Sequence, residues 1–75
     1  MTTKEKLMHL LEMCLEKGLN YQINYKFSLI EISQFNDDNE RTFHVRAYFD
    51  CDECVEIGHL ITFDNLITKV KNYQP

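Results

Sequence analysis

The chain has 75 residues and a formal net charge of −4, and 44% of its residues are hydrophobic. This composition predicts one ordered domain over residues 1–75, since disordered chains are poor in the aromatic and β-branched residues found here. No stretch is long and apolar enough to span a bilayer, and the N-terminal segment carries Lys4, Glu5 and Lys6 where a secretory signal would be apolar. The sequence therefore predicts a cytoplasmic protein with no membrane partner.

The first predicted element is a helix over residues 3–17. Thr2 and Glu5 have the spacing of a capping box, and Gly18 is a helix stop signal. At about 100° per residue, Met13 falls outside the apolar arc of this helix and is expected to be exposed. The arc itself consists of Leu7, Met8, Leu10, Leu11, Cys14 and Leu15.

The middle of the chain predicts three strands. Tyr21, Ile23 and Tyr25 alternate with polar residues, as in a half-buried strand. The alternation loses phase near residue 27, which favours a turn over residues 26–28 between two strands, although one bulged strand is the alternative. The polar run 36–40 is then a hairpin connection, and residues 43–49 alternate as the third strand.

A second helix is expected to begin near Thr62, whose hydroxyl can cap the first turn, with Asp64 at the positive end of the helix dipole. The predicted fold class is therefore α+β: a helix, a three-stranded antiparallel sheet and a helix, with both helices on one face of the sheet. The predicted core consists of Leu7, Leu11, Cys14, Leu15, Ile23, Ile30, Ile32, Phe43, Val45, Ala47, Phe49, Leu66, Ile67 and Val70.

The negative charge is concentrated in residues 36–64. This segment holds Arg41 and Arg46 as its only bases, against Asp37, Asp38, Glu40, Asp50, Asp52, Glu53, Glu56 and Asp64. Such a belt repels phosphate backbones, which argues against direct nucleic-acid binding. It is either an ordinary solvated surface or a surface that attracts a basic partner.

One segment has the composition of a metal site. Cys51, Cys54, His59 and Asp64 have the spacing of a retroviral-type zinc knuckle with aspartate in place of the last cysteine, and zinc accepts thiolate, imidazole and carboxylate ligands. The segment lacks the aromatic and basic residues of such knuckles, so the alternative is two ordinary cysteines in a loop. With three cysteines in the chain, reduced thiols are expected, and no cofactor other than zinc is expected.

The sequence contains no catalytic signature. There is no Ser-His-Asp order, no glycine-rich phosphate loop and no His-Glu-x-x-His, so no enzymatic activity is expected. The outer face of the sheet would display His44, Arg46 and Tyr48. These residues are either part of a solvated face or an anchor for a partner, because Tyr and Arg are enriched among binding residues.

The order of elements resembles that of double-stranded RNA-binding domains, but the second helix begins with residues 62–65, Thr-Phe-Asp-Asn, where those domains have a lysine cluster. In size, acidity and element order the chain also resembles small phage-encoded inhibitors of the anti-CRISPR type. That resemblance implies a viral or mobile-element inhibitor whose carboxylates engage a basic groove on a host protein.

The predicted function is therefore a non-enzymatic binding protein that acts through protein–protein interaction with a basic host surface. The alternative is a structural zinc module, and a homodimer is compatible with either. The predicted partner-binding residues are Asp37, Asp38, Glu40, Tyr48, Asp52, Glu53 and Glu56.

Overall fold

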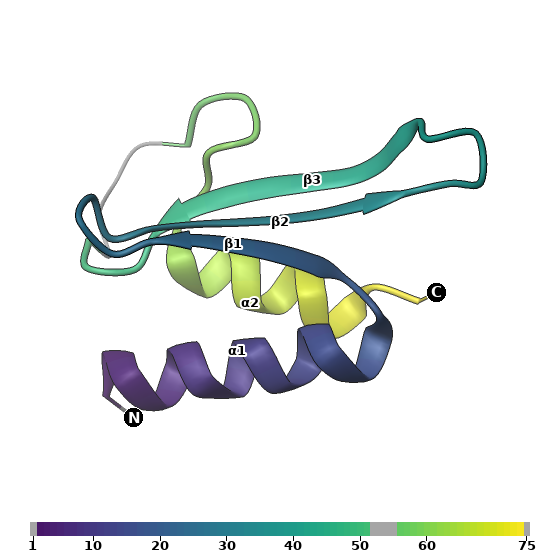
Figure 1. The fold of residues 1–75 in the computed structure, drawn as a ribbon. Coiled ribbons are helices and arrows are strands. Elements are labelled where there is room, and N and C mark those ends of the chain that lie inside the picture. The colour runs from purple at the N-terminus through teal and green to yellow at the C-terminus, as the bar shows by residue number, and fades with distance from the viewer. Residues whose placement is uncertain (1, 52–55, 75) are drawn as a thin grey trace.

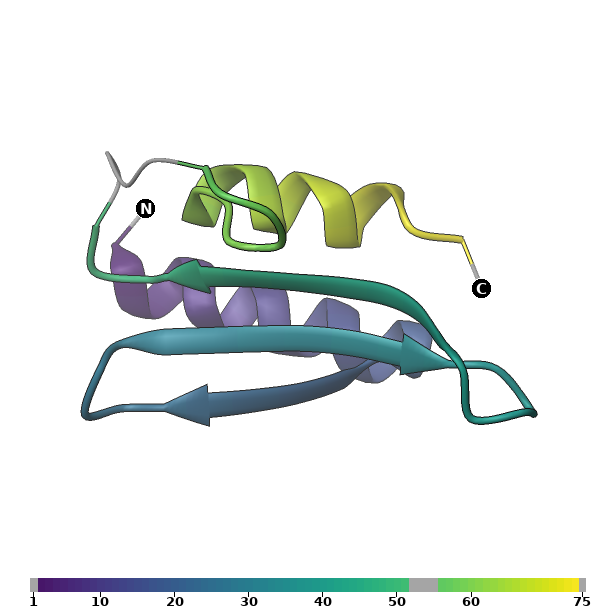
Figure 2. The ribbon, with the colours of Figure 1, turned by 90° about the horizontal axis from the view of Figure 1, so that it is seen from above.

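The structure is a computed structural model that describes residues 2–51 and 56–74. Its elements follow the order α1 (Thr3–Lys17), β1 (Asn20–Asn24), β2 (Leu29–Phe35), β3 (Arg41–Tyr48) and α2 (Phe63–Asn72). Figure 1 shows both helices on the same side of the sheet, and Figure 2 shows the same arrangement from above. The predicted α+β class and element order are confirmed. None of the helices in the described ranges is long and apolar enough to cross a membrane.

Both ends of α1 lie where the sequence signals predict them. Glu5 N donates a hydrogen bond to Thr2 Oγ1 at 3.2 Å, and Thr2 N donates to Glu5 Oε1 at 3.2 Å. This reciprocal pair satisfies two donors that the first helical turn leaves without an intrahelical partner. Gly18 ends the helix in the left-handed conformation, with φ of 69°, which glycine adopts without steric cost.

The sheet has the antiparallel order β1-β2-β3. Residues 25–28 form a turn between β1 and β2, so two strands are present rather than one bulged strand. The register pairs Ile30 with Ala47 and Ile32 with Val45 on the face that meets the helices. All four of these side chains are buried, and the sheet therefore has one apolar inner face and one outer face.

Half of the predicted core positions are buried, most of the others pack against the buried core, and further residues join it. It consists of Leu10, Met13, Cys14, Leu19, Ile30, Ile32, Val45, Ala47, Ile61, Phe63, Leu66 and Val70, with Leu7, Leu11, Ile23, Phe43, Phe49, Ile67 and Tyr73 packed against it. The prediction was wrong at two positions of α1. Leu15 is 70% exposed, whereas Met13, which was expected to be exposed, has an exposure of 8%.

The position of α2 explains these two corrections. Lys6 Nζ lies 3.0 Å from Asp64 Oδ1, and Lys17 Nζ donates hydrogen bonds to backbone carbonyls at the end of α2. Because Met13 shares the helix side of Lys6 and Lys17, it is covered by α2. Leu15 follows Lys6 by nine residues, which at 3.6 residues per turn is about 180° around the helix. It therefore points away from α2.

The two edges of the sheet differ. On the β3 edge, Arg46 N donates to His59 O at 2.7 Å and Ile61 N donates to Arg46 O at 2.8 Å. These bonds form a parallel bridge between Arg46 and Leu60 and bury Ile61 against the core. On the opposite edge, β1 pairs with β2 alone within the described part of the chain.

Candidate partner-binding surface

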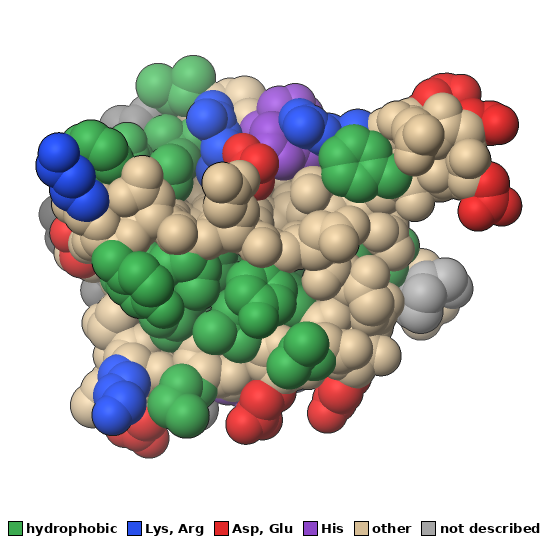
Figure 3. Space-filling view, viewed as in Figure 1, with side chains coloured by type: hydrophobic (Ala, Val, Ile, Leu, Met, Phe, Trp, Pro, Cys, Tyr) green, Lys and Arg blue, Asp and Glu red, His purple; other side chains and the backbone are tan. Residues whose placement is uncertain are grey.

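Three of the predicted partner-binding carboxylates lie together at the end of the β2–β3 hairpin. We call Asp37, Asp38 and Glu40 the acidic tip. All three are exposed, and Figure 3 shows acidic side chains gathered at the end of a projection from the body of the molecule. No basic residue interrupts residues 36–40. The acidic tip is thus a local concentration of negative charge in open solvent.

Asn36 gives the acidic tip a defined conformation. Its side-chain Oδ1 accepts hydrogen bonds from Asp38 N and Glu40 N, each at 2.9 Å. Its backbone N–H donates to Glu40 O at 2.9 Å, and its carbonyl accepts from Asn39 N at 3.0 Å. Asn39 takes a left-handed φ of 61°, which Asn tolerates better than most residues. The carboxylates are therefore carried by a hydrogen-bonded loop.

The remaining predicted partner-binding residues do not join the acidic tip. Tyr48 lies at the other end of β3 and is half-buried, opposite Leu29. Glu56 is exposed, and its Oε1 accepts a hydrogen bond from Asn65 Nδ2 near the start of α2. An eight-residue strand such as β3 spans roughly 25 Å. Tyr48 is therefore on a different part of the surface from the acidic tip. Asp52 and Glu53 lie outside the described residues.

The outer face of the sheet carries a cluster of His44, Arg46 and Glu31. Glu31 and Arg46 are directly opposite in the β2–β3 register. Arg41 Nη1 lies 3.2 Å from His44 Nδ1. Arg41 is the donor of this hydrogen bond, because a guanidinium has no acceptor atom. His44 Nε2 then faces Glu31 Oε2 at 3.0 Å, an ion-pair distance without hydrogen-bond alignment. The His59 ring packs on His44, with 4.7 Å between the ring centroids.

This packing makes the outer face less open than the sequence predicts. His44 and Arg46 are both half-buried, and Arg46 Nε is buried with no hydrogen-bond partner in residues 2–51 and 56–74. An open depression of about 180 Å³ lies on the neighbouring part of this face, lined by Gln22, Asn24, Leu29 and Glu31. This volume is below the roughly 300–1,000 Å³ of ordinary small-molecule pockets.

The described residues of the predicted zinc site have other structural roles. Cys51 is disulfide-bonded, which corrects the expectation of a reduced thiol at this position, and a disulfide sulfur is not the thiolate that zinc binds. His59 packs on His44, and Asp64 pairs with Lys6. Within residues 2–51 and 56–74, no three His, Cys, Asp or Glu side chains are placed to hold a metal ion. Cys54 lies outside these ranges.

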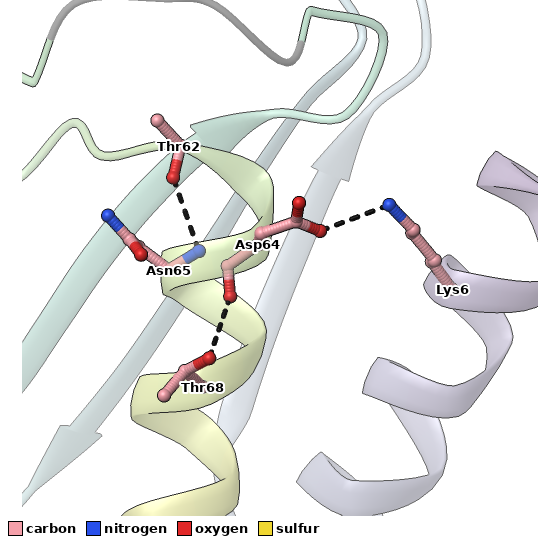
Figure 4. Close-up of polar contacts among 5 residues, drawn as sticks. All are labelled: Lys6, Thr62, Asp64, Asn65 and Thr68. Carbon is pink, nitrogen blue, oxygen red and sulfur yellow. Dashed lines mark hydrogen bonds and ion pairs between the residues drawn. The ribbon is translucent and has the colours of Figure 1, made fainter. Parts of the chain in front are cut away.

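Asp64 belongs to the polar network at the start of α2 (Figure 4). Thr62 is the N-cap, as predicted, and its Oγ1 accepts a hydrogen bond from Asn65 N at 3.2 Å. The Asp64 carboxylate points toward Lys6 of α1, while its backbone carbonyl accepts from Thr68 Oγ1 at 3.0 Å. This carboxylate therefore stabilises the start of α2 and links the two helices.

The Gly-His pair that suggested a zinc knuckle forms a tight turn. Ile57 N donates to Leu60 O at 2.8 Å, and Leu60 N donates back to Ile57 O at 2.9 Å. Gly58, with φ of 58°, occupies the first central position, where a type II′ turn requires glycine. His59 follows at the second central position. The turn thus places Leu60 against β3. This structural role accounts for the presence of Gly58 and His59 without a metal site.

No family model matches the chain, and no curated protein or solved structure is significantly similar to it.

Proposed function

We propose that this chain is a non-enzymatic binding protein whose acidic tip engages a basic groove on a partner protein. In the biological form of the proposal, the chain is a phage- or mobile-element-encoded inhibitor that acts in the host cytoplasm, in the manner of an anti-CRISPR protein. The partner is a host protein, and neither a cofactor nor direct contact with nucleic acid is needed.

The observation that carries the proposal is the structure of the acidic tip. Three exposed carboxylates sit at the end of a projecting hairpin, and the side chain of Asn36 fixes the backbone that bears two of them. A projection of this shape can enter a groove that a flat surface cannot reach. Clustered charge of one sign accelerates encounter with an oppositely charged partner, and a loop that is already ordered loses less conformational entropy on binding.

The test is a pull-down from lysate of a low-GC Gram-positive bacterium, with the wild-type chain as bait and mass spectrometry as the readout. The test variant carries Asp37→Lys, Asp38→Lys and Glu40→Lys. The control variant carries Glu12→Lys, Glu16→Lys and Asp50→Lys, which are also exposed positions. Both variants have the same net charge, so only the location of the change differs.

The proposal predicts a host protein that the wild type and the control variant retain and the tip variant loses. Circular dichroism and thermal unfolding of all three chains check that each is folded. Retention of the same protein by the tip variant would refute a binding role for the acidic tip. Equal loss from both variants would show that overall charge, rather than the tip, governs capture.

A further inference from the structure

Among the residues that the structure describes, no segment covers the β1 edge of the sheet, in contrast to the β3 edge. Alternate backbone N–H and C=O groups of β1 point away from β2, and within the described residues no further strand or bridge pairs with them. Soluble proteins usually protect such an edge with Lys, Pro, a bulge or a covering loop. The β1 sequence, Asn-Tyr-Gln-Ile-Asn, contains neither Lys nor Pro, and its register with β2 is regular.

An apolar strip runs from α1 to the start of β1. It consists of Met8 and Leu15 on α1 and Tyr21 on β1, which are 54%, 70% and 42% exposed. Met8 and Leu15 are seven residues apart and share the side of α1 that faces away from α2. Figure 3 shows hydrophobic side chains gathered between α1 and the sheet in this view. An open backbone edge and exposed apolar side chains therefore lie next to each other.

The charge distribution favours a second copy of the chain as the occupant. In a two-fold dimer the same patch meets itself, so any charge at its centre faces a like charge. Among the helices and strands of the described residues, β1 alone carries no charged residue. The acidic tip belongs to the β2–β3 hairpin and not to β1. For a chain of net charge −4, β1 is thus the element where self-association meets least repulsion.

We infer that two copies pair through antiparallel β1 strands and form a continuous six-stranded sheet. If the strand pairs over its full length, the two-fold axis passes through its central residue, Gln22. Tyr21 of one copy then lies opposite Ile23 of the other on the inner face. Antiparallel pairing about this axis keeps all helices on one side, so the apolar strips of the two copies meet beneath the seam. The two acidic tips would lie at opposite ends of the sheet.

The first test is the mass of the purified chain in solution, measured by light scattering after size exclusion. The wild type should have twice the 9.0 kDa mass of one chain. Leu15→Glu should reduce this to the mass of one chain. Ile57→Glu is the matched control, because Ile57 is also 70% exposed but lies on the turn near β3, and it should leave the dimer intact.

A second test does not depend on disrupting the strip. Residues directly opposite in antiparallel strands have Cβ atoms about 4.5–5.5 Å apart, so Gln22→Cys should give a disulfide-linked dimer on mild oxidation. Asn24→Cys, two residues from the axis, should not link to its own copy. A wild type with the mass of one chain, a dimer that survives Leu15→Glu, or equal cross-linking at residues 22 and 24 would each overturn the inference.

Discussion

The side chain of Asn36 holds the backbone of the acidic tip. Its side chain accepts two backbone hydrogen bonds that alanine cannot replace. We predict that Asn36→Ala lowers the free energy of unfolding by about 1–2 kcal/mol and weakens partner binding although every carboxylate remains. Urea unfolding checks the first effect, with Asp37→Ala in the same loop as the control. An unchanged stability would show that the loop does not need this side chain.

Cys14 should make stability depend on alkaline pH. Its thiol is buried in the core, and burial raises the pKa of Cys14 from 9.0 to about 11. The unfolded chain therefore releases the thiol proton first as pH rises, so stability falls between these two values. The slope from one such group approaches about 1.4 kcal/mol per pH unit.

Urea unfolding at about pH 8 and about pH 10 measures this loss. Comparison with Cys14→Ala at the same pH values removes the contributions of the lysines and tyrosines, which both chains share. The wild type should lose more stability than the variant. Equal losses would contradict a protonated Cys14 in the folded core.

At the scale of elements, α1 stabilises the end of α2. Lys17 Nζ donates to the carbonyl oxygens of Val70, Lys71 and Tyr73 at 2.8, 2.6 and 2.8 Å. Val70 O also accepts from Tyr73 N at 3.2 Å, so Lys17 adds a second donor to it. The last turn of a helix leaves carbonyls without intrahelical donors, and a cation there also suits the helix dipole.

We predict that Lys17→Met lowers the free energy of unfolding by about 1–3 kcal/mol, because methionine keeps much of the aliphatic packing but provides no donor. Lys69→Met removes an exposed lysine from α2 itself and should lower the free energy of unfolding by less than Lys17→Met does. Chemical unfolding compares the two variants, and similar midpoints would indicate that the three contacts of Lys17 contribute little.

The start of α2 depends on the hydroxyl of Thr62. Thr62→Ala removes the acceptor for Asn65 N, and we expect a loss of about 0.5–2 kcal/mol, as for other N-cap substitutions. Thr62→Ser, which keeps the hydroxyl, should restore most of this stability. Thermal unfolding distinguishes the two variants, and an alanine variant as stable as the serine variant would contradict the capping role.

The elements were predictable because their signals are local. The capping box at Thr2, the stop at Gly18 and the cap at Thr62 each act over a few residues. The exchange of Met13 and Leu15 was not predictable, because it depends on which side of α1 receives α2. Nor does spacing alone distinguish a zinc knuckle from the turn that brings His59 beside His44, since that turn is fixed by pairing with β3.

For the whole molecule, the structure separates two surfaces with different properties. The acidic tip projects from one end of the sheet, whereas the apolar strip and the open β1 edge lie along its side. The sequence indicated the charge of the tip but not its projection, which results from the β2–β3 hairpin extending beyond the helices. A partner bound at the tip and a second copy at β1 would therefore not compete for the same surface.

The most direct test of the central claim is the affinity of the chain for the protein that it captures, measured at low and at physiological salt. We predict that reversing Asp37, Asp38 and Glu40 weakens binding at least about 100-fold and removes most of the salt dependence. Reversing Glu12, Glu16 and Asp50 should change affinity much less. Equal affinities for the two variants, or binding by the wild type that does not respond to salt, would contradict this claim.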